Sequence, residues 1–167
     1  MGRNGILVYF AAAIRGDRVV AEDVRMMIQF IQEKGISVLS EHVGAADPVA
    51  MFAHRVGKRK DEVTKIDIER QDIAWLDEAT HVIAEISGAS TGTGREIEHG
   101  RVKGELGKTP AKVLCLYRQD REFSASAMIR GMTPDRYPNV MVLSYANLDD
   151  ALSHILSFLQ LQVELPL

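Results

Sequence analysis

The sequence predicts an α/β fold, a single-domain, doubly wound sheet of five parallel strands in the order 2-1-3-4-5. Five short apolar segments alternate along the chain with segments whose apolar residues recur every three or four positions. The first apolar segment, residues 5–13 (GILVYFAAA), is continuously apolar, as expected for a parallel strand covered on both faces. At 167 residues the chain, residues 1–167, has the length of one domain with one core.

The N-terminal half alternates between the two patterns. Apolar residues within 20–31 recur at helical spacing, and Gly35 predicts the end of that helix. Residues 36–39 predict a second, short strand, and residues 47–48 (Asp-Pro) are types preferred at a helix N-cap and first position. Residues 61–78 predict the next helix. Its expected inward-facing residues are Val63, Ile66, Ile73 and Leu76.

The C-terminal half continues the alternation. The remaining strands are predicted at residues 81–86, 112–117 and 140–143. A helix over residues 94–106 contains Gly100 and Gly104, and each helical glycine costs about 1 kcal/mol relative to alanine. We therefore expect the two glycines to allow close packing against the sheet or a partner. Asn147 is expected to cap a final helix, which completes a flavodoxin-like or Rossmann-like pattern.

Composition excludes several classes of protein. The content of hydrophobic residues is 46%, that of charged residues 26%, and the net charge is -3, so no strong field favours nucleic acid or an acidic membrane. The basic residues within 55–60 are followed at once by two acidic residues, which is typical of a solvated turn. No apolar segment approaches the roughly 18 residues that span a bilayer. The single cysteine, Cys115, lies in an apolar run, so we expect a buried thiol and a cytoplasmic location.

The segment around which we expect function to be organised is residues 87–100 (SGASTGTGREIEHG). A buried strand, then small and hydroxylated residues, then a helix start is the arrangement that forms a backbone cradle for an anion. Ser90, Gly92 and Gly94 are therefore candidates to hold a phosphate, and Glu96 is expected in the first helical turn beside it. The structural alternative is that Glu96 only complements the helix dipole, which contributes about 0.3–1 kcal/mol.

The predicted topology places this segment at a ligand-binding position. In doubly wound sheets, ligands bind beyond the carboxyl ends of the strands where the strand order reverses, here between the first and third strands. The loops at residues 11–16 and 87–96 meet there. Tyr9, Arg15 and Glu96 are therefore expected to share one cleft, which Asp72 from the preceding helix completes.

With these residues assembled, the chain resembles the nucleoside 2-deoxyribosyltransferase family, and most of all its hydrolytic branch, the 2'-deoxynucleoside 5'-monophosphate N-glycosidases. The resemblance covers nearly the whole chain in several ordered motifs. They are Tyr9-Phe10 with Ile14-Arg15-Gly16, Ser40-Glu41-His42-Val43, residues 71–76 (QDIAWL), residues 90–96 (STGTGRE) and residues 126–131 (SAMIRG).

The resemblance implies a role for each matching residue. Glu96 falls on the family's nucleophile, Asp72 on the acid that acts near the base, and Tyr9 on the tyrosine that positions the nucleophile. Phosphate- and sugar-binding positions fall on Phe10, Ala12, Ile14, Arg15, Gly16, Ser90 and Gly92. Ser126 falls on a serine that, in the hydrolase branch, reaches the phosphate from the neighbouring subunit, which implies a homodimer. His42 and Met128 are further candidates. Read alone, Tyr9, Asp72 and His42 also fit structural roles.

The implied reaction is hydrolysis of the N-glycosidic bond of 2'-deoxynucleoside 5'-monophosphates, with Glu96 as nucleophile and no cofactor. No set of residues has the usual spacing of metal ligands. The chain departs from the family at Ala12-Ala13, where the mammalian-type hydrolases have Gly-Ser, and at Arg95, where tyrosine is common.

Three alternative functions remain open. One is a deoxyribosyltransferase that passes the sugar to a second base, against which the Ser126 motif argues. Another is a ribonucleoside 5'-monophosphate phosphoribohydrolase, whose glycine-rich motif residues 92–96 partly match without its preceding paired glycines. The third is a nucleotide-binding module without turnover, for which the Ala12-Ala13 departure is the best argument.

Overall fold

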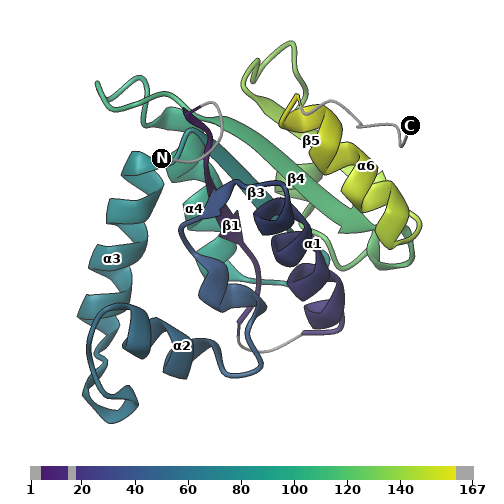
Figure 1. Cartoon of the computed structure of the whole chain (residues 1–167). Coiled ribbons are helices and arrows are strands. Elements are labelled where there is room, and N and C mark those ends of the chain that lie inside the picture. The colour runs from purple at the N-terminus through teal and green to yellow at the C-terminus, as the bar shows by residue number, and fades with distance from the viewer. Residues whose placement is uncertain (1–4, 15–17, 161–167) are drawn as a thin grey trace, which may run out of the picture.

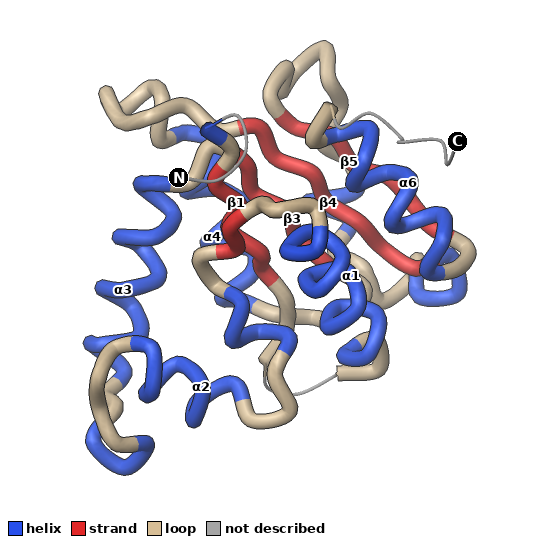
Figure 2. The backbone as a smooth tube through the Cα atoms, viewed as in Figure 1, coloured by secondary structure: helices blue, strands red, loops and turns tan. Residues whose placement is uncertain are grey.

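The structure is a computed structural model that describes residues 5–14 and 18–160. Five parallel strands form one sheet in the order β2-β1-β3-β4-β5, which confirms the predicted topology. Figures 1 and 2 show this sheet with helices on both of its faces. The strands are β1 (Leu7–Ala11), β2 (Ser37–Val38), β3 (His81–Glu85), β4 (Lys112–Arg118) and β5 (Val140–Tyr145).

The helices form two layers with separate cores. Helices α1 (Ala21–Glu33) and α6 (Leu148–Phe158) cover one face, and α3 (Lys65–Glu78) and α4 (Thr91–Val102) cover the other (Figure 1). Shorter helices α2 (Pro48–Arg55) and α5 (Ala127–Arg130) lie in connections between strands. Successive residues of a strand point to opposite faces, so Phe10 packs in the α1/α6 core and Tyr9 in the α3/α4 core.

Three helix boundaries follow the sequence signals. Gly35 has φ +76°, a left-handed conformation that glycine adopts without strain, just beyond the end of α1. The Asp47 carboxylate accepts a hydrogen bond from the Ala50 N–H (3.0 Å) at the start of α2. The Asn147 side chain accepts one from the Asp150 N–H (3.1 Å) at the start of α6. These contacts satisfy donors that have no partner within their own helix.

Helix α3 begins at Lys65, so the prediction that it starts at residue 61 was wrong. The Thr64 hydroxyl accepts the Asp67 N–H (3.2 Å), and the Asp67 carboxylate accepts the Thr64 N–H (2.9 Å). This reciprocal capping starts the helix there. Ile66, expected to face inward, is 53% exposed.

Helix α4 begins at Thr91 rather than at residue 94, because the Ser90 hydroxyl caps it by accepting the Thr93 N–H (3.2 Å). Glu96 is therefore in the second turn, and its predicted place in the first turn was wrong. A Cβ on Gly100 would lie 2.8 Å from Val82 Cγ2, and one on Gly104 would lie 3.2 Å from Pro110 Cβ. The close approach allowed by Gly100 is thus to the sheet of its own chain.

Within the described ranges, none of the helices is long and apolar enough to cross a membrane. The same residues contain no group of three or more His, Cys, Asp or Glu side chains that could hold a metal ion. The Cys115 thiol is buried as expected, and burial raises its pKa to about 12.

Candidate active site

Three residues from distant parts of the chain meet at the carboxyl ends of β1 and β3. Tyr9, in β1, is almost fully buried, and its hydroxyl donates to Glu96 Oε1 at 2.9 Å. Asp72 is on the face of α3 that lines the same cleft as Glu96. The structure therefore brings together the three residues assigned to chemistry by resemblance, although 87 positions separate the hydrogen-bonded pair.

Burial changes the ionisation of both carboxyl groups. The pKa of Asp72 is raised to about 7, first by desolvation and then by the negative charge of Glu96. Asp72 Oδ1 is buried and has no hydrogen-bond partner among the described residues. The pKa of Glu96 is also raised by burial, while the Tyr9 hydrogen bond and Arg95 oppose that rise. The site therefore combines a carboxyl group held by the Tyr9 hydrogen bond with an acid that is partly protonated at neutral pH.

The cleft beside Glu96 has a volume of about 300 Å³, at the lower end of the range for small-molecule sites. One face of α3, the start of α4 and the end of the segment after β1 form its walls. Its lining residues are Ile14, Lys65, Ile68, Glu69, Asp72, Ile73, Leu76, Gly92, Arg95 and Glu96. Arg95 forms an ion pair with Glu69 at 2.6 Å, which joins α4 to α3 at the exposed rim.

Ser90 and Gly92 stand at the N-terminus of α4, as an anion cradle requires. The first N–H groups of a helix have no partner within it and carry the positive end of the helix dipole. A Cβ at Gly92 would have only Ser90 Oγ near it, at 3.8 Å, so the backbone here is open to a ligand. Gly92 lines the Glu96 cleft, whereas Ser90 lines a neighbouring cleft.

Ser126 and Met128 lie in a second cleft, of about 480 Å³, together with Ser90, Thr91 and Gly94. This cleft contains neither Asp72 nor Glu96. Ser126 precedes α5 without a hydrogen bond from its side chain to that helix, and Met128 is 85% exposed. Within one chain, Ser126 is thus near the phosphate candidate Ser90 but outside the cleft of the carboxyl pair.

Residues at the end of β1 and just after it differ in how close they lie to the Glu96 cleft. Phe10 is in the core, and its N–H donates to Ser40 Oγ while its carbonyl accepts from the same hydroxyl, both at 2.7 Å. Ala12 is buried, and Ile14 lines the Glu96 cleft. Arg15 and Gly16 lie outside the described residues.

His42 is buried in a 3-10 turn (Glu41–Gly44), between the rings of Phe52 (5.3 Å between centroids) and Trp75 (5.7 Å). Burial and, secondarily, the Arg55 charge lower its pKa to about 4, so the imidazole is neutral at pH 7. Its Nδ1 is buried and has no partner in the described ranges.

Sequence reasoning missed two kinds of residue near the site. Lys65 and Glu69 precede Asp72 by about two helical turns and one turn, a spacing that becomes visible only once the start of α3 is known. Glu85, at the end of β3, is a buried carboxyl with its own hydrogen-bond network. Its signal in the sequence is a charge inside an otherwise apolar run.

Comparison with known proteins finds relatives of this chain by sequence and by fold. A Thermofilum pendens protein with the provisional name 2'-deoxynucleoside 5'-phosphate N-hydrolase 1 is 33% identical over 95% of this chain and 98% of its own. The 5-hydroxymethyl-dUMP N-hydrolase of Tetraodon nigroviridis is 36% identical over 74% of this chain and 78% of its own. A solved Clostridium botulinum CMP N-glycosidase has the same fold, with a TM-score of 0.59 and 18% identity over 89% of this chain and 96% of that chain. No protein-family model matches the sequence.

Proposed function

This chain belongs to the family of the 2'-deoxynucleoside 5'-phosphate N-hydrolases, and from that premise we propose that it hydrolyses the N-glycosidic bond of 2'-deoxynucleoside 5'-monophosphates. The products are the free base and 2-deoxyribose 5-phosphate. The observation that carries the assignment of the chemistry is the half-buried pair of carboxyl groups, Glu96 held by Tyr9 and Asp72 with a raised pKa, in one cleft.

Glu96 is the proposed nucleophile. Breaking the bond between C1' and the base nitrogen develops positive charge on the sugar, which a carboxylate below C1' stabilises. Glu96 forms a bond to C1' as the bond to the base breaks, and water then hydrolyses this glycosyl-enzyme, as in retaining glycosidases. The Tyr9 hydroxyl fixes one oxygen of Glu96 at 2.9 Å, which limits the orientations of the carboxylate.

Asp72 is the proposed acid for the departing base. The base nitrogen gains electrons as the bond breaks, so a proton delivered to the base makes it a better leaving group. With a pKa of about 7 and an oxygen free of partners, Asp72 can hold that proton at neutral pH and direct it into the cleft.

The phosphate is proposed to bind at the N-terminus of α4, held by Ser90, Gly92 and the segment after β1. Ser126 of a second subunit completes that site in a homodimer. Support for an interface comes from the exposed apolar residues beside Ser126, because Phe123 is 100% and Met128 85% exposed. The single buried thiol fits a cytoplasmic location for the reaction.

The first experiment compares dGMP with deoxyguanosine and measures release of free guanine. An anion cradle contributes only when the substrate carries the phosphate, so kcat/KM should be far higher for dGMP. Equal values would instead favour the transferase alternative. Adding a second free base and analysing for a new nucleoside would identify that reaction directly.

The second experiment replaces the nucleophile. Glu96→Ala should still bind dGMP but lose turnover by several orders of magnitude, because it removes a bond that forms only during the reaction. Glu98→Ala is the matched control, since Glu98 is on the same helix but pairs with Arg101 at the surface. Retention of about a tenth of the wild-type rate by Glu96→Ala would rule out this assignment.

A further inference from the structure

A second buried carboxyl group lies outside the cleft of Glu96 and Asp72. Glu85 is the last residue of β3 and is only 2% exposed. Alternation along the strand directs its side chain to the α1/α6 face, opposite to the face that carries Tyr9. The proposed chemistry gives this carboxyl no part in bond breaking, although it directly precedes the β3–α4 loop.

Three donors converge on Glu85. The Ser87 N–H donates to Oε2 at 3.1 Å, and the Ser87 hydroxyl and the Tyr145 hydroxyl (3.1 Å) donate to Oε1. Ser87 Oγ in turn accepts the N–H of Arg118 at 2.8 Å, so the same serine is tied to β4. The Glu85 carboxylate therefore fixes the first residues of the β3–α4 loop.

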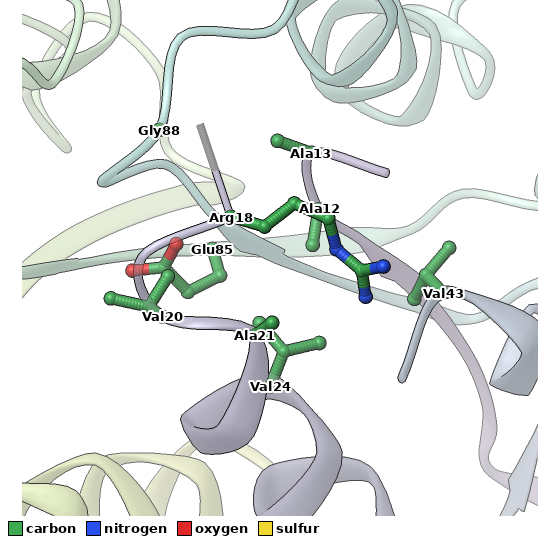
Figure 3. Close-up of a pocket in the computed structure, with 9 residues that line it drawn as sticks. All are labelled: Ala12, Ala13, Arg18, Val20, Ala21, Val24, Val43, Glu85 and Gly88. Carbon is green, nitrogen blue, oxygen red and sulfur yellow. The ribbon is translucent and has the colours of Figure 1, made fainter. Parts of the chain in front are cut away.

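Glu85 also lies between the two segments that meet at the proposed phosphate site. Figure 3 shows its side chain pointing toward Val20 at the start of α1, with Ala13 and Gly88 across the cavity from that helix. The cavity between these groups has a volume of only about 10 Å³, so the segments around it are closely packed. On the same side, Arg18 donates to the Ala45 carbonyl at 3.2 Å.

The surrounding charges do not neutralise Glu85. Asp23 of α1 accepts from Tyr145 (3.5 Å) and lies 3.7 Å from the Arg118 guanidinium, and Arg18 is engaged with Ala45. Burial, and secondarily the charge of Asp23, raise the pKa of Glu85 to about 7, although its hydrogen bonds oppose the rise. A raised pKa means that the folded state binds this proton more tightly. The contribution of Glu85 to the free energy of unfolding therefore falls as pH rises from 4.5 through 7.

We propose that Glu85 is a positioning residue, whose carboxylate holds the β3–α4 loop in the conformation that presents Ser90 and Gly92 to the substrate phosphate. The chain of contacts runs from Glu85 to Ser87, through Gly88 and Ala89, to Ser90, which caps α4. This inference rests on the proposed function, since it names a determinant of the same phosphate site.

The energetic argument separates positioning from stability. A buried carboxylate whose pKa is raised destabilises the fold when ionised, so an uncharged side chain of similar length removes that cost, whereas the donors left without an acceptor add one. Removal of the Glu85 oxygens, in contrast, leaves the Ser87 N–H without its acceptor, so the β3–α4 loop is no longer held in place. Replacing a residue that only stabilised the fold would lower the melting temperature without raising KM for dGMP.

The test compares Glu85→Met, which removes both acceptor oxygens, with Glu85→Gln, which keeps one. At pH 8 we expect KM for dGMP to rise about tenfold or more in Glu85→Met and less in Glu85→Gln. Slow turnover of deoxyguanosine, which has no phosphate, should stay at the wild-type level.

Thr80→Val is the matched control, because Thr80 makes a comparable bond at the opposite end of β3, where its hydroxyl accepts the Leu7 N–H at 2.9 Å. It should lower the melting temperature without raising KM. An unchanged KM in Glu85→Met, or equal losses for dGMP and deoxyguanosine, would overturn the proposal. If the wild-type protein releases no base, the proposed function fails. In that case calorimetry still tests the role of Glu85, by the dissociation constant for dGMP. A weaker affinity in Glu85→Met than in the wild type would support the role, and an equal affinity would overturn it.

Discussion

At the scale of single residues, the site depends on two carboxyl groups that ionise differently although they share one cleft. Tyr9 donates to Glu96, which favours the carboxylate. At Asp72 desolvation outweighs the opposing contact with Tyr9, and Oδ1 is buried without a partner among the described residues. The negative charge of Glu96 further raises the pKa of Asp72. Ionisation of one group therefore keeps the other protonated, which is how a nucleophile and an acid can act at the same pH.

This arrangement predicts a bell-shaped dependence of kcat/KM on pH. Asp72 must be protonated, so activity should fall as pH rises through about 7. Glu96 must be ionised and its pKa is raised above 4.5, so activity should also fall on the acid side at a pH above that value. Initial rates of guanine release from dGMP across the pH range measure both limbs.

The Asp72→Asn variant shows whether Asp72 causes the alkaline limb of the pH profile. The amide cannot deliver a proton to the base as an acid does, so kcat should fall and the alkaline limb should disappear. The acid limb should remain near its wild-type position, because Asp72 is already protonated and neutral in the pH range where Glu96 ionises. An alkaline limb that persists in Asp72→Asn would show that another group carries it.

At the scale of elements, Gly100 fixes how closely α4 approaches the sheet. Gly100→Ala gains helix propensity of about 1 kcal/mol, but the new methyl group would lie 2.8 Å from Val82 Cγ2 in a fully buried strand. Overpacking of this kind costs about 1–3 kcal/mol, so we expect a net loss of stability in urea unfolding. Gly94→Ala is the control, since nothing lies within 4 Å of its added Cβ. A Gly100→Ala protein as stable as Gly94→Ala would mean that α4 shifts without cost.

The elements also show what the sequence can and cannot predict. Strand order and a cleft shared by Tyr9 and Glu96 followed from apolar patterns and the rule for strand-order reversal, because both depend on long-range periodicity. The direct contact of Tyr9 with Glu96 was predicted only by the family resemblance. The starts of α3 and α4 were misplaced by three or four residues, because Thr64 and Ser90 caps act through local hydrogen bonds. The Glu85 network required tertiary contacts with Tyr145 and Arg118 that sequence spacing does not encode.

At the scale of the whole molecule, one subunit has two clefts, which separate Ser90 and Ser126 from the carboxyl pair. Ser90 and Ser126 share the 480 Å³ cleft, whereas Asp72 and Glu96 line the 300 Å³ cleft on α3. The N-terminus of α4 adjoins both, since Ser90 borders one and Gly92 the other. The proposed homodimer requires the Ser126 of a second subunit to reach this N-terminus, and the exposed Phe123 and Met128 beside Ser126 are the apolar surface that such an interface would cover.

Subunit mixing tests that arrangement. If Ser126 reaches the neighbouring subunit's phosphate, a heterodimer of Glu96→Ala and Ser126→Ala subunits contains one site with both residues and one site with neither. Re-equilibrated mixtures should then release more guanine than the average of the two separate variants, provided that Ser126→Ala alone is substantially impaired. Sedimentation of the wild-type protein establishes its oligomeric state under the assay conditions. An active monomer, or no gain in activity despite demonstrated subunit exchange, would place Ser126 in the site of its own chain or outside the chemistry, because only a shared site can be restored by exchanging subunits.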